Sequence, residues 1–348
     1  MTLARIWGTR YPLIQAPMAG VQDERLALAV SAAGALGSLP AAMLDAVSLR
    51  TKLRVLQDSK LPYNVNFFSH RPPPSNAAIE EKWRAILKPY YTELAIDAHQ
   101  IPTSGGRRPF DAQIAEVLEE FRPTMVSFHF GLPDKGLLAP IKARGAFVAS
   151  SATTLREVLW LQENGADGVI LQGLEAGGHR GHFLDYDIRL QSTTITLLDA
   201  VAGKISIPAI AAGGIADASG VEAAMARGSS GVQVGTSFLL CTEALTGPTH
   251  RARLRDVNAP TELTNLFSGG LARGLINRAI LELGPVNKFA PPFPNAANAT
   301  SPLRSKSESI GLDAFTPLWS GMNRSGCIDG PAAKVVEELI RGFVTTHS

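Results

Sequence analysis

The stretch from Gly168 to Gly181 carries the side chains best suited to chemistry. A short apolar run, 169–171, ends at the amide Gln172, and a loop with four glycines and His179 follows. Loops at the carboxyl ends of parallel strands commonly carry catalytic residues, and glycines there let backbone N–H groups approach a ligand. A histidine on such a loop can act as a general base or present positive charge to an anionic substrate. We therefore predict that His179 is the active-site histidine.

The other histidines have weaker support. His129 ends a second apolar run, but the pattern Phe-His-Phe also suits a core histidine with one hydrogen bond. We expect a surface role for His182 and no role at the site for the rest, which are His70, His99, His250 and His347. There is no HExxH motif, His/Cys cluster or acidic ligand spacing, so we expect no metal. The absence of GxSxG argues against a serine hydrolase.

Two glycine turns predict an anion site. Gly213-Gly214 and Gly235-Thr236 each follow an apolar run and precede a helical or turn segment. In barrels, backbone N–H groups at such late turns commonly hold a phosphate, although plain turn chemistry would produce the same pattern. We expect Asp217 to cap the helix 218–227 rather than to take part in catalysis.

Polar side chains at other strand ends would line a cofactor held by these turns. Amides supply both donors and acceptors without net charge, which suits a ring system such as an isoalloxazine. Taken singly, each of these side chains could equally serve to satisfy the backbone. The candidates are Gln15, Asn66, Ser127 and Gln172.

Eight strand-like apolar runs, separated by helical segments, must position these residues. They lie at 13–18, 35–39, 63–68, 125–130, 146–150, 169–171, 208–212 and 231–234. This alternation predicts an α/β fold, specifically a TIM (β/α)₈ barrel. An open doubly wound sheet is the alternative, but no GxGxxG follows the first run.

The chain is expected to form three parts. Residues 1–239 would form the barrel, 240–313 a smaller, mainly helical lid over the strand ends, and 314–348 a segment that returns to the barrel. The amphipathic stretch 331–344 would close it. A peripheral appendage with no role at the site is the alternative for the lid.

Composition excludes several functional classes. The chain has 348 residues, 45% hydrophobic and 18% charged, with a formal charge of +2. Its basic residues are scattered, which argues against nucleic acid as a partner. The two cysteines, Cys241 and Cys327, form no CxxC pattern and indicate a reducing compartment. No signal peptide or membrane-spanning run is apparent, so we expect a cytoplasmic protein.

Six motifs together resemble the nitronate monooxygenases, formerly called 2-nitropropane dioxygenases. They occur in the family order and span about three quarters of the chain, and EAGGHRG is the most specific of them. The motifs are QAPMAGV at 15–21, VSFHFG at 126–131, LQGLEAGGHRG at 171–181, PAIAAGGIAD at 208–217, GVQVGT at 231–236 and LFSGGLARGLINR at 266–278.

The resemblance implies a TIM barrel that binds FMN non-covalently. It implies His179 as the active-site histidine and His129 on the substrate side. It also implies the oxidation of alkyl nitronates, such as propionate 3-nitronate, or of nitroalkanes, by O₂ to a carbonyl compound and nitrite. For a nitronate, His179 need not be a base and could hold the anion by charge and hydrogen bonding. The implied cofactor-binding residues are Ala16, Pro17, Met18, Asn66, Gln172, Gly177, Gly178, Gly213, Gly214, Gln233, Val234, Gly235 and Thr236.

The chain departs from the family pattern near the substrate. Many members carry tyrosine, histidine and lysine in the segment that is here 293–304, where this chain has Phe293, Asn295 and Asn298. Gly270 also stands where an arginine is common. The substrate could therefore be a different anion or a larger apolar molecule. The alternative functions are an FMN- and NAD(P)H-dependent reductase of the enoyl-ACP reductase type and a flavin-binding barrel without turnover. We expect the protein to be a monomer or homodimer.

Overall fold

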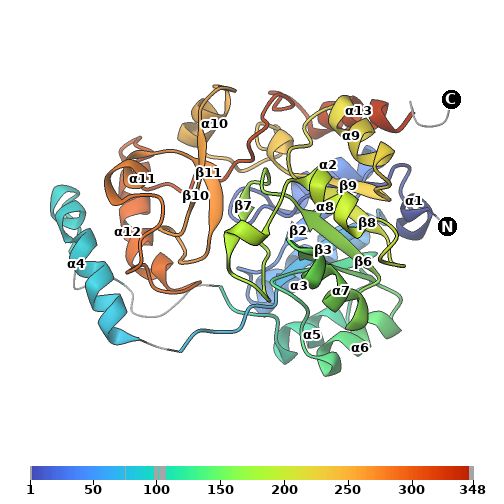
Figure 1. The fold of residues 1–348 in the computed structure, drawn as a ribbon, viewed down its shortest axis with the longest axis horizontal. Helices are drawn as coiled ribbons and strands as arrows, with labels where there is room; N and C mark the ends of the chain where they lie inside the picture. Colours follow the sequence, from blue (N-terminus) through green and yellow to red (C-terminus); the bar gives the residue numbers. More distant parts are fainter. Residues whose placement is uncertain (1, 75, 98–100, 102–106, 345–348) are drawn as a thin grey trace.

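Eight parallel strands form the centre of the protein. The computed structural model describes residues 2–74, 76–97, 101 and 107–344. The strands follow the ring order β1-β9-β8-β6-β5-β4-β3-β2, and a bridge between Ile14 and Leu36 joins the two ends. The predicted TIM barrel is thereby confirmed (Figure 1). The strands are β1 (Leu13–Gln15), β2 (Gly37–Pro40), β3 (Tyr63–Phe68), β4 (Met125–His129), β5 (Phe147–Ala152), β6 (Gly168–Gln172), β8 (Ala209–Ala212) and β9 (Gly231–Val234).

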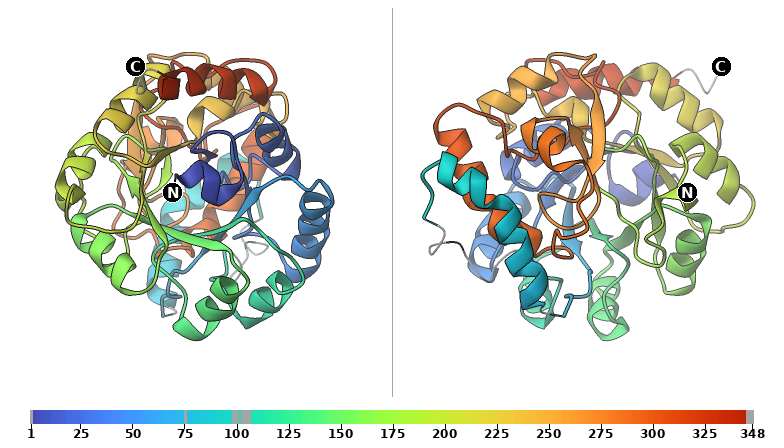
Figure 2. Two further views of the ribbon diagram at one scale, coloured as in Figure 1. Left: turned by 90° about the vertical axis from the view of Figure 1, so that its right-hand side faces the viewer. Right: turned by 60° about the vertical axis from the view of Figure 1, so that its left-hand side comes forward.

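Helices surround this barrel, as the left view of Figure 2 shows. The last helix packs against α9 and α2, between the last strand and the first, so it closes the ring as the sequence predicts. The Asp217 carboxylate caps α9 by accepting a hydrogen bond from the Gly220 N–H at 3.0 Å, as expected. The helices of the ring are α2 (Glu24–Ala32), α3 (Ala46–Asp58), α5 (Ala112–Leu118), α6 (Lys135–Ala143), α7 (Leu155–Glu163), α8 (Thr194–Val201), α9 (Ala218–Ala226) and α13 (Ala332–Val344).

A short helix, α1 (Leu3–Trp7), fills the amino-terminal end of the barrel. Trp7 is 1% exposed and meets Phe147 edge to face at a centroid distance of 5.9 Å. Leu3 and Trp7 belong to one apolar cluster with residues from six strands or strand ends, including Ile170 and Ile210. Because this end is packed with apolar side chains, the open end is the one where the strands finish.

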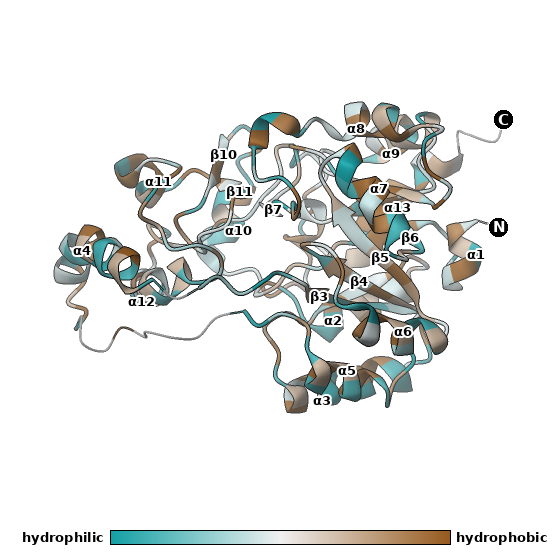
Figure 3. Cartoon of the chain, turned by 60° about the horizontal axis from the view of Figure 1, so that its bottom comes forward, coloured by the Kyte–Doolittle hydropathy of each residue, from teal (hydrophilic) through white to brown (hydrophobic). Residues whose placement is uncertain are grey.

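A second unit stands over the carboxyl ends of the strands. Helix α4 (Ala77–Glu93), from the β3–β4 connection, packs on α12, and the Tyr91 hydroxyl donates to the Ala299 carbonyl at 2.7 Å. The lid boundaries 240–313 stay a prediction, but the packing adds α4 to this unit. In Figure 3, α4 shows hydrophilic and hydrophobic residues together, as expected for a helix that covers a core with one face. The other elements of this unit are α10 (Pro248–Leu254), β10 (Thr261–Thr264), β11 (Ala272–Leu275), α11 (Arg278–Leu283) and α12 (Ala296–Ser309).

Four segments have sequence patterns that predict something other than what forms. The composition of 246–259 predicts a helix, but only α10 forms there, because the chain then turns into strand β10, which pairs with β11 within the glycine-rich stretch 264–277. The stretch 290–303, rich in Pro, Asn and Ala, shows no helical period, yet it contains most of α12 despite Pro302, since packing against α4 overrides local propensity. A helix predicted over 76–98 ends at Glu93, and part of the loop predicted at 103–109 lies outside the described residues.

Candidate functional site

A cavity lies between the carboxyl ends of the strands and the lid. Including the part of its mouth open to solvent, it holds about 1340 Å³ of empty space. It is a concave site at the strand ends of a barrel, where small molecules and cofactors commonly bind. The two histidines and the cofactor-binding residues that the family resemblance implies all line it, namely Ala16, Pro17, Met18, Asn66, His129, Gln172, Gly177, Gly178, His179, Gly213, Gly214, Gln233, Val234, Gly235 and Thr236.

Gln15 and Ser127 do not line the cavity, which corrects the prediction for these two strand-end side chains. Both are fully buried inside the barrel. The Gln15 amide exchanges hydrogen bonds with Gln22, and the Ser127 hydroxyl accepts from Asn64 and Asn66. Their polar groups are used by neighbouring strands, so they hold the barrel together instead of meeting a ligand.

The loop after β6 is fastened by two of its own side chains. The Gln172 amide donates to the His179 carbonyl at 2.8 Å, and its oxygen accepts from the Gly181 N–H at 2.7 Å. The fully buried Arg180 guanidinium donates to the carbonyls of Gln172 and Gly173. Gly177 must be glycine, because a Cβ there would lie 2.4 Å from the Gly321 nitrogen. The loop is therefore held in one conformation.

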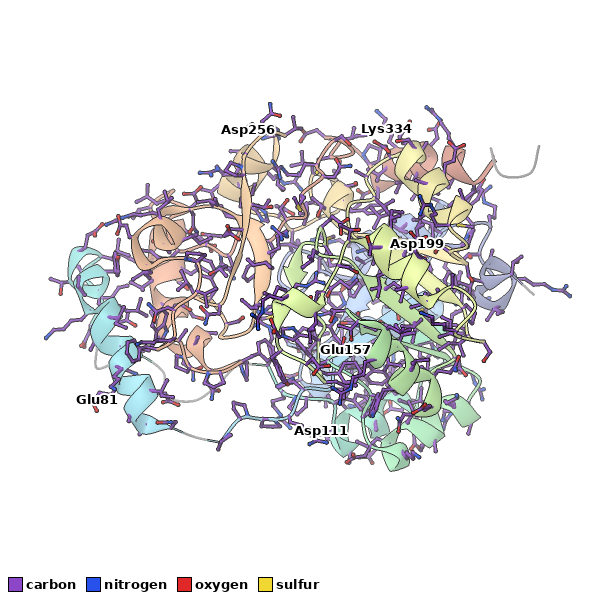
Figure 4. All side chains as sticks on the ribbon, viewed as in Figure 1. Glu81, Asp111, Glu157, Asp199, Asp256 and Lys334 are labelled. Carbon is purple, nitrogen blue, oxygen red and sulfur yellow. The ribbon has the colours of Figure 1, made fainter. Side chains whose placement is uncertain are left out.

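Glu157 on α7 fastens the continuation of this loop. Its carboxylate, labelled in Figure 4, is fully buried. It accepts hydrogen bonds from the backbone N–H groups of Phe183 and Leu184 and from both the N–H and the hydroxyl of Thr153. A buried carboxylate with this many donors is a structural brace for the catalytic loop.

His179 lies where the barrel and the lid meet. It belongs to β7 (Gly178–His179), which pairs antiparallel with β11 of the lid. Its Nε2 lies 2.7 Å from the Ser268 hydroxyl oxygen. Within the described part of the chain Nδ1 has no hydrogen-bond partner, so Nδ1 is the ring nitrogen available to a ligand. A sequence motif could not reveal Ser268, since only the lid fold brings it to the loop.

His129 supports the backbone of His179. Its Nε2 lies 3.1 Å from the His179 carbonyl oxygen, which can only accept, so Nε2 carries the proton. Burial lowers the pKa of His129 to about 4, and the neutral ring then accepts from the Ser151 hydroxyl at 3.0 Å through Nδ1. His129 thus lines the cavity in a fixed tautomer beside the active-site loop.

Aromatic rings build the wall behind His179. Phe293 lies 5.2 Å from the His179 ring and 4.9 Å from the ring of His70, centroid to centroid. Phe130, 5.0 Å from Phe293, has φ of +68°, a left-handed conformation that costs about 1–2 kcal/mol for a residue with Cβ. Trp319 lines the cavity 5.4 Å from His179.

Three further residues at or near the cavity were missed by the sequence reasoning. Arg107, from the β3–β4 connection, and His250, on α10, line it, and His70 is buried next to Phe293. His250 thus lies at the cavity although its sequence context does not indicate it, whereas His70 contacts Phe293 but does not line the cavity. Their sequence neighbourhoods carry no strand-end pattern, because the lid and the long connection bring them to the cavity.

His179 is neutral in this setting. Burial, followed by the charge of Arg107, holds the pKa of His179 well below its usual value of 6.5. The neighbouring histidines His129 and His70 act in the same direction. A low pKa favours hydrogen bonding over positive charge as the way in which His179 would meet an anion, and Arg107 supplies a positive charge nearby.

The turns at Gly213-Gly214 and Gly235 form the opposite end of the cavity. Gly213 and Gly214 have φ of +115° and +74°, which favours glycine at both positions. The Asn323 amide donates to the Gly214 carbonyl at 3.0 Å, and the Gly321 N–H donates to the Thr236 hydroxyl at 2.9 Å. Gln233, which lines the cavity, has a buried side-chain oxygen with no partner among the described residues.

His182 is buried, only 6% exposed, instead of on the surface as predicted. Burial and the Arg180 charge lower the pKa of His182 to about 4, and its Nδ1 accepts from the Gln191 amide at 2.9 Å. His182 therefore takes up a proton near pH 6.5 in the unfolded chain but only near pH 4 in the folded protein. This histidine therefore destabilises the fold as pH falls through that window, by about 1.4 kcal/mol per pH unit.

We expect His182→Asn to flatten this pH dependence. Urea unfolding at pH 7, 6 and 5 should show that the free energy of unfolding of the variant falls less steeply with pH than that of the wild type. The two slopes should differ by about 1.4 kcal/mol per pH unit, the contribution of one proton. Parallel slopes for the two proteins would contradict the neutral state of His182.

The described residues lack two features that would point to other functions. Across 2–74, 76–97, 101 and 107–344, no group of three or more His, Cys, Asp or Glu residues could hold a metal ion. No helix in the same part of the chain is long and apolar enough to cross a membrane.

Known proteins resemble this chain over its whole length. The profile of the nitronate monooxygenase family matches residues 1–342. Proteins named nitronate monooxygenase from Pseudomonas aeruginosa and Paraburkholderia phytofirmans are 36% and 37% identical, covering 97% of this chain and 97% and 94% of their own lengths. A nitroalkane oxidase structure from Streptomyces ansochromogenes has a TM-score of 0.90 at 33% identity, over 98% of both chains. FabK from Thermotoga maritima shares the fold, with 24% identity and a TM-score of 0.71 over 99% of this chain and 97% of its own.

Proposed function

The chain belongs to the nitronate monooxygenase family, and we propose that it oxidises alkyl nitronates with FMN and O₂ to carbonyl compounds and nitrite. As a member of this family it is an oxidoreductase. The observation that carries the proposal is the geometry around His179, a half-buried histidine with a lowered pKa that lines the same cavity as the two glycine turns.

The residues present fit a phosphorylated flavin. The Gly213-Gly214 turn is open and left-handed, and within the described residues the N–H of Gly214 and that of Ile215 have no acceptor. Such N–H groups suit a phosphate. The unpartnered Gln233 oxygen suits an N–H of a flavin ring, because a buried acceptor without a donor is costly. Ala16 to Met18 would lie along the ring, as the resemblance implies.

This chain's own residues would orient the nitronate. FMN, when bound, supplies the electron transfer between the nitronate and O₂. The single hydroxyl hydrogen of Ser268 can go to Nε2 of neutral His179, at 2.7 Å, or to the Gly270 carbonyl, at 3.4 Å. The shorter contact favours donation to Nε2, which leaves the ring proton on Nδ1. The Nδ1–H group then donates to a nitronate oxygen, and the Gln172 and His129 contacts to the His179 carbonyl keep this donor in place. The aromatic wall excludes water from the hydrogen bond.

We expect the purified protein to be yellow and to consume O₂ with release of nitrite when propionate 3-nitronate is added. The absorption spectrum before and after anaerobic addition of the nitronate checks both parts, because bleaching requires a bound flavin and an electron donor. Bleaching with NADPH and an enoyl thioester, without reaction with a nitronate, would instead assign the chain to the reductases. A colourless protein that never takes up FMN would overturn the cofactor assignment.

A further inference from the structure

Arg107 is a cation in the cavity without an acidic partner. Its guanidinium lines the cavity and lies 5.8 Å from the centroid of the Phe293 ring. Its Nε is buried and has no hydrogen-bond partner in the described part of the chain, and no ion pair joins Arg107 to a described residue. The residues outside that part include no aspartate or glutamate. Within the described residues, therefore, no carboxylate forms an ion pair with this charge.

The surroundings of Arg107 are neutral or positive. Burial and the nearby charge of Arg304 lower the pKa of Arg107 to about 10, so it stays protonated at neutral pH. Its charge in turn helps to hold the pKa values of His70 and His179 down. Arg107 is half-buried and its Nε is fully buried without a partner among the described residues. A partly desolvated cation without a counter-charge is costly, and an anion bound in the cavity would offset that cost.

We propose that Arg107 determines substrate specificity by binding a carboxylate on the nitronate whose nitro group meets His179. This inference rests on the proposed function of the same site. The planar guanidinium can bind a carboxylate through two parallel hydrogen bonds, whereas His179 offers the nitronate a single donor. Phe293 touches both residues, with its ring 5.2 Å from that of His179.

The space between the two residues is apolar, which suits a short carbon chain. Phe68 lines the cavity with its ring 6.4 Å from that of His179 and 6.0 Å from that of Phe293. A nitronate without a carboxylate would satisfy His179 but leave Arg107 unpaired. The preferred substrate class is therefore a small nitronate with an anionic group at its other end.

Two matched substrates and two variants test this assignment. Propionate 3-nitronate carries the carboxylate, and propyl-1-nitronate has the same carbon chain without it. We expect Arg107→Gln to raise KM for propionate 3-nitronate on the order of 10- to 100-fold, as for the loss of a charge-assisted hydrogen bond. For propyl-1-nitronate the change should be under about 3-fold, on the same reasoning. Arg107→Lys should be intermediate, because it keeps the charge but loses the planar fork.

Arg108→Gln is the matched control, since the adjacent Arg108 side chain is 74% exposed and pairs with Asp111. It should leave both KM values unchanged. Equal losses with both substrates in Arg107→Gln would mean that Arg107 binds the nitronate itself, and unchanged values would mean that it binds neither. Either result overturns the proposal, provided that flavin content matches the wild type.

Binding without turnover separates this proposal from the proposed function. Succinate has the length of propionate 3-nitronate with two carboxylates, and Trp319 in the cavity wall can report its binding by fluorescence. If the wild type oxidises neither nitronate, the proposed function fails. Weaker succinate binding by Arg107→Gln than by the wild type or Arg108→Gln would still support the anion site. Equal affinity in all three proteins would refute it.

Discussion

His179→Ala should lower kcat/KM for an alkyl nitronate by about 10²–10³-fold, the effect typical of removing one preorganised donor from an active site. The physical reason is that Nδ1 is the ring nitrogen left free by Ser268, so the variant loses the hydrogen bond to the substrate anion. Flavin content should stay at the wild-type level, because the side chain lies on the substrate side of the cavity. Steady-state O₂ consumption and the flavin spectrum measure the two quantities.

Two companion variants make this result specific. Ser268→Ala should lower kcat/KM about tenfold, because Nε2 of His179 loses the hydroxyl donor that favours a proton on Nδ1. His182→Asn, a buried histidine near the loop that does not line the cavity, serves as the control at pH 7.5. An unchanged kcat/KM in His179→Ala would remove this histidine from the mechanism.

The choice of substrate also separates two roles for His179. A general base would matter for a neutral nitroalkane, which must lose its α-proton, but not for a nitronate. Because burial and Arg107 hold the pKa of His179 well below 6.5, it would be a weak base. We expect the wild type to favour nitronates over nitroalkanes, and His179→Ala to affect nitronate oxidation strongly. A loss confined to nitroalkanes would assign His179 as the base.

Gly214→Val should abolish most FMN binding, raising Kd at least about 100-fold through a clash at the phosphate turn and the loss of left-handed backbone geometry. A Cβ at this position would already lie 3.3 Å from the Glu175 Cβ, and the branched side chain would add bulk beside the Gly214 and Ile215 N–H groups that fit the phosphate. Titration of the apoprotein with FMN, followed by flavin fluorescence, measures the loss.

Backbone strain needs its own control. Gly203 has φ of +70°, close to the +74° of Gly214, and nothing lies within 4 Å of the position of its Cβ. Gly203→Val therefore introduces the same strain of about 1–2 kcal/mol away from the cavity. If both variants lose FMN equally, strain rather than the phosphate clash explains the loss. Full flavin occupancy in Gly214→Val would place the phosphate elsewhere.

Local periodicity was enough to predict the barrel. Runs such as 63–68 and 231–234 are short and apolar, and glycines or prolines end most of them, so their strand character does not depend on distant residues. The lid depends on contacts between segments far apart in sequence. Helix α12 contains Pro302 and forms on α4, some 200 residues earlier, so its own residues did not predict it.

Position after an apolar run was enough to assign many strand-end residues to the cavity, since the carboxyl ends of parallel strands converge at one end of a barrel. Gln172 and Gly214 line it as their place after such runs predicts. Gln15 and Ser127 follow the same pattern but do not line the cavity, because their polar groups form hydrogen bonds inside the barrel, and these depend on tertiary contacts. Strand pairing between β7 and β11 likewise holds His179 beside Ser268.

The charge at the site was likewise decided by the tertiary structure. The motif predicts a histidine at the mouth, but its protonation depends on burial and on Arg107, which arrives from the β3–β4 connection. Solvation and charge–charge energies depend on three-dimensional distance, which a motif does not contain. The sequence thus identified the histidine, while the fold made it neutral and gave the positive charge to an arginine outside the motifs.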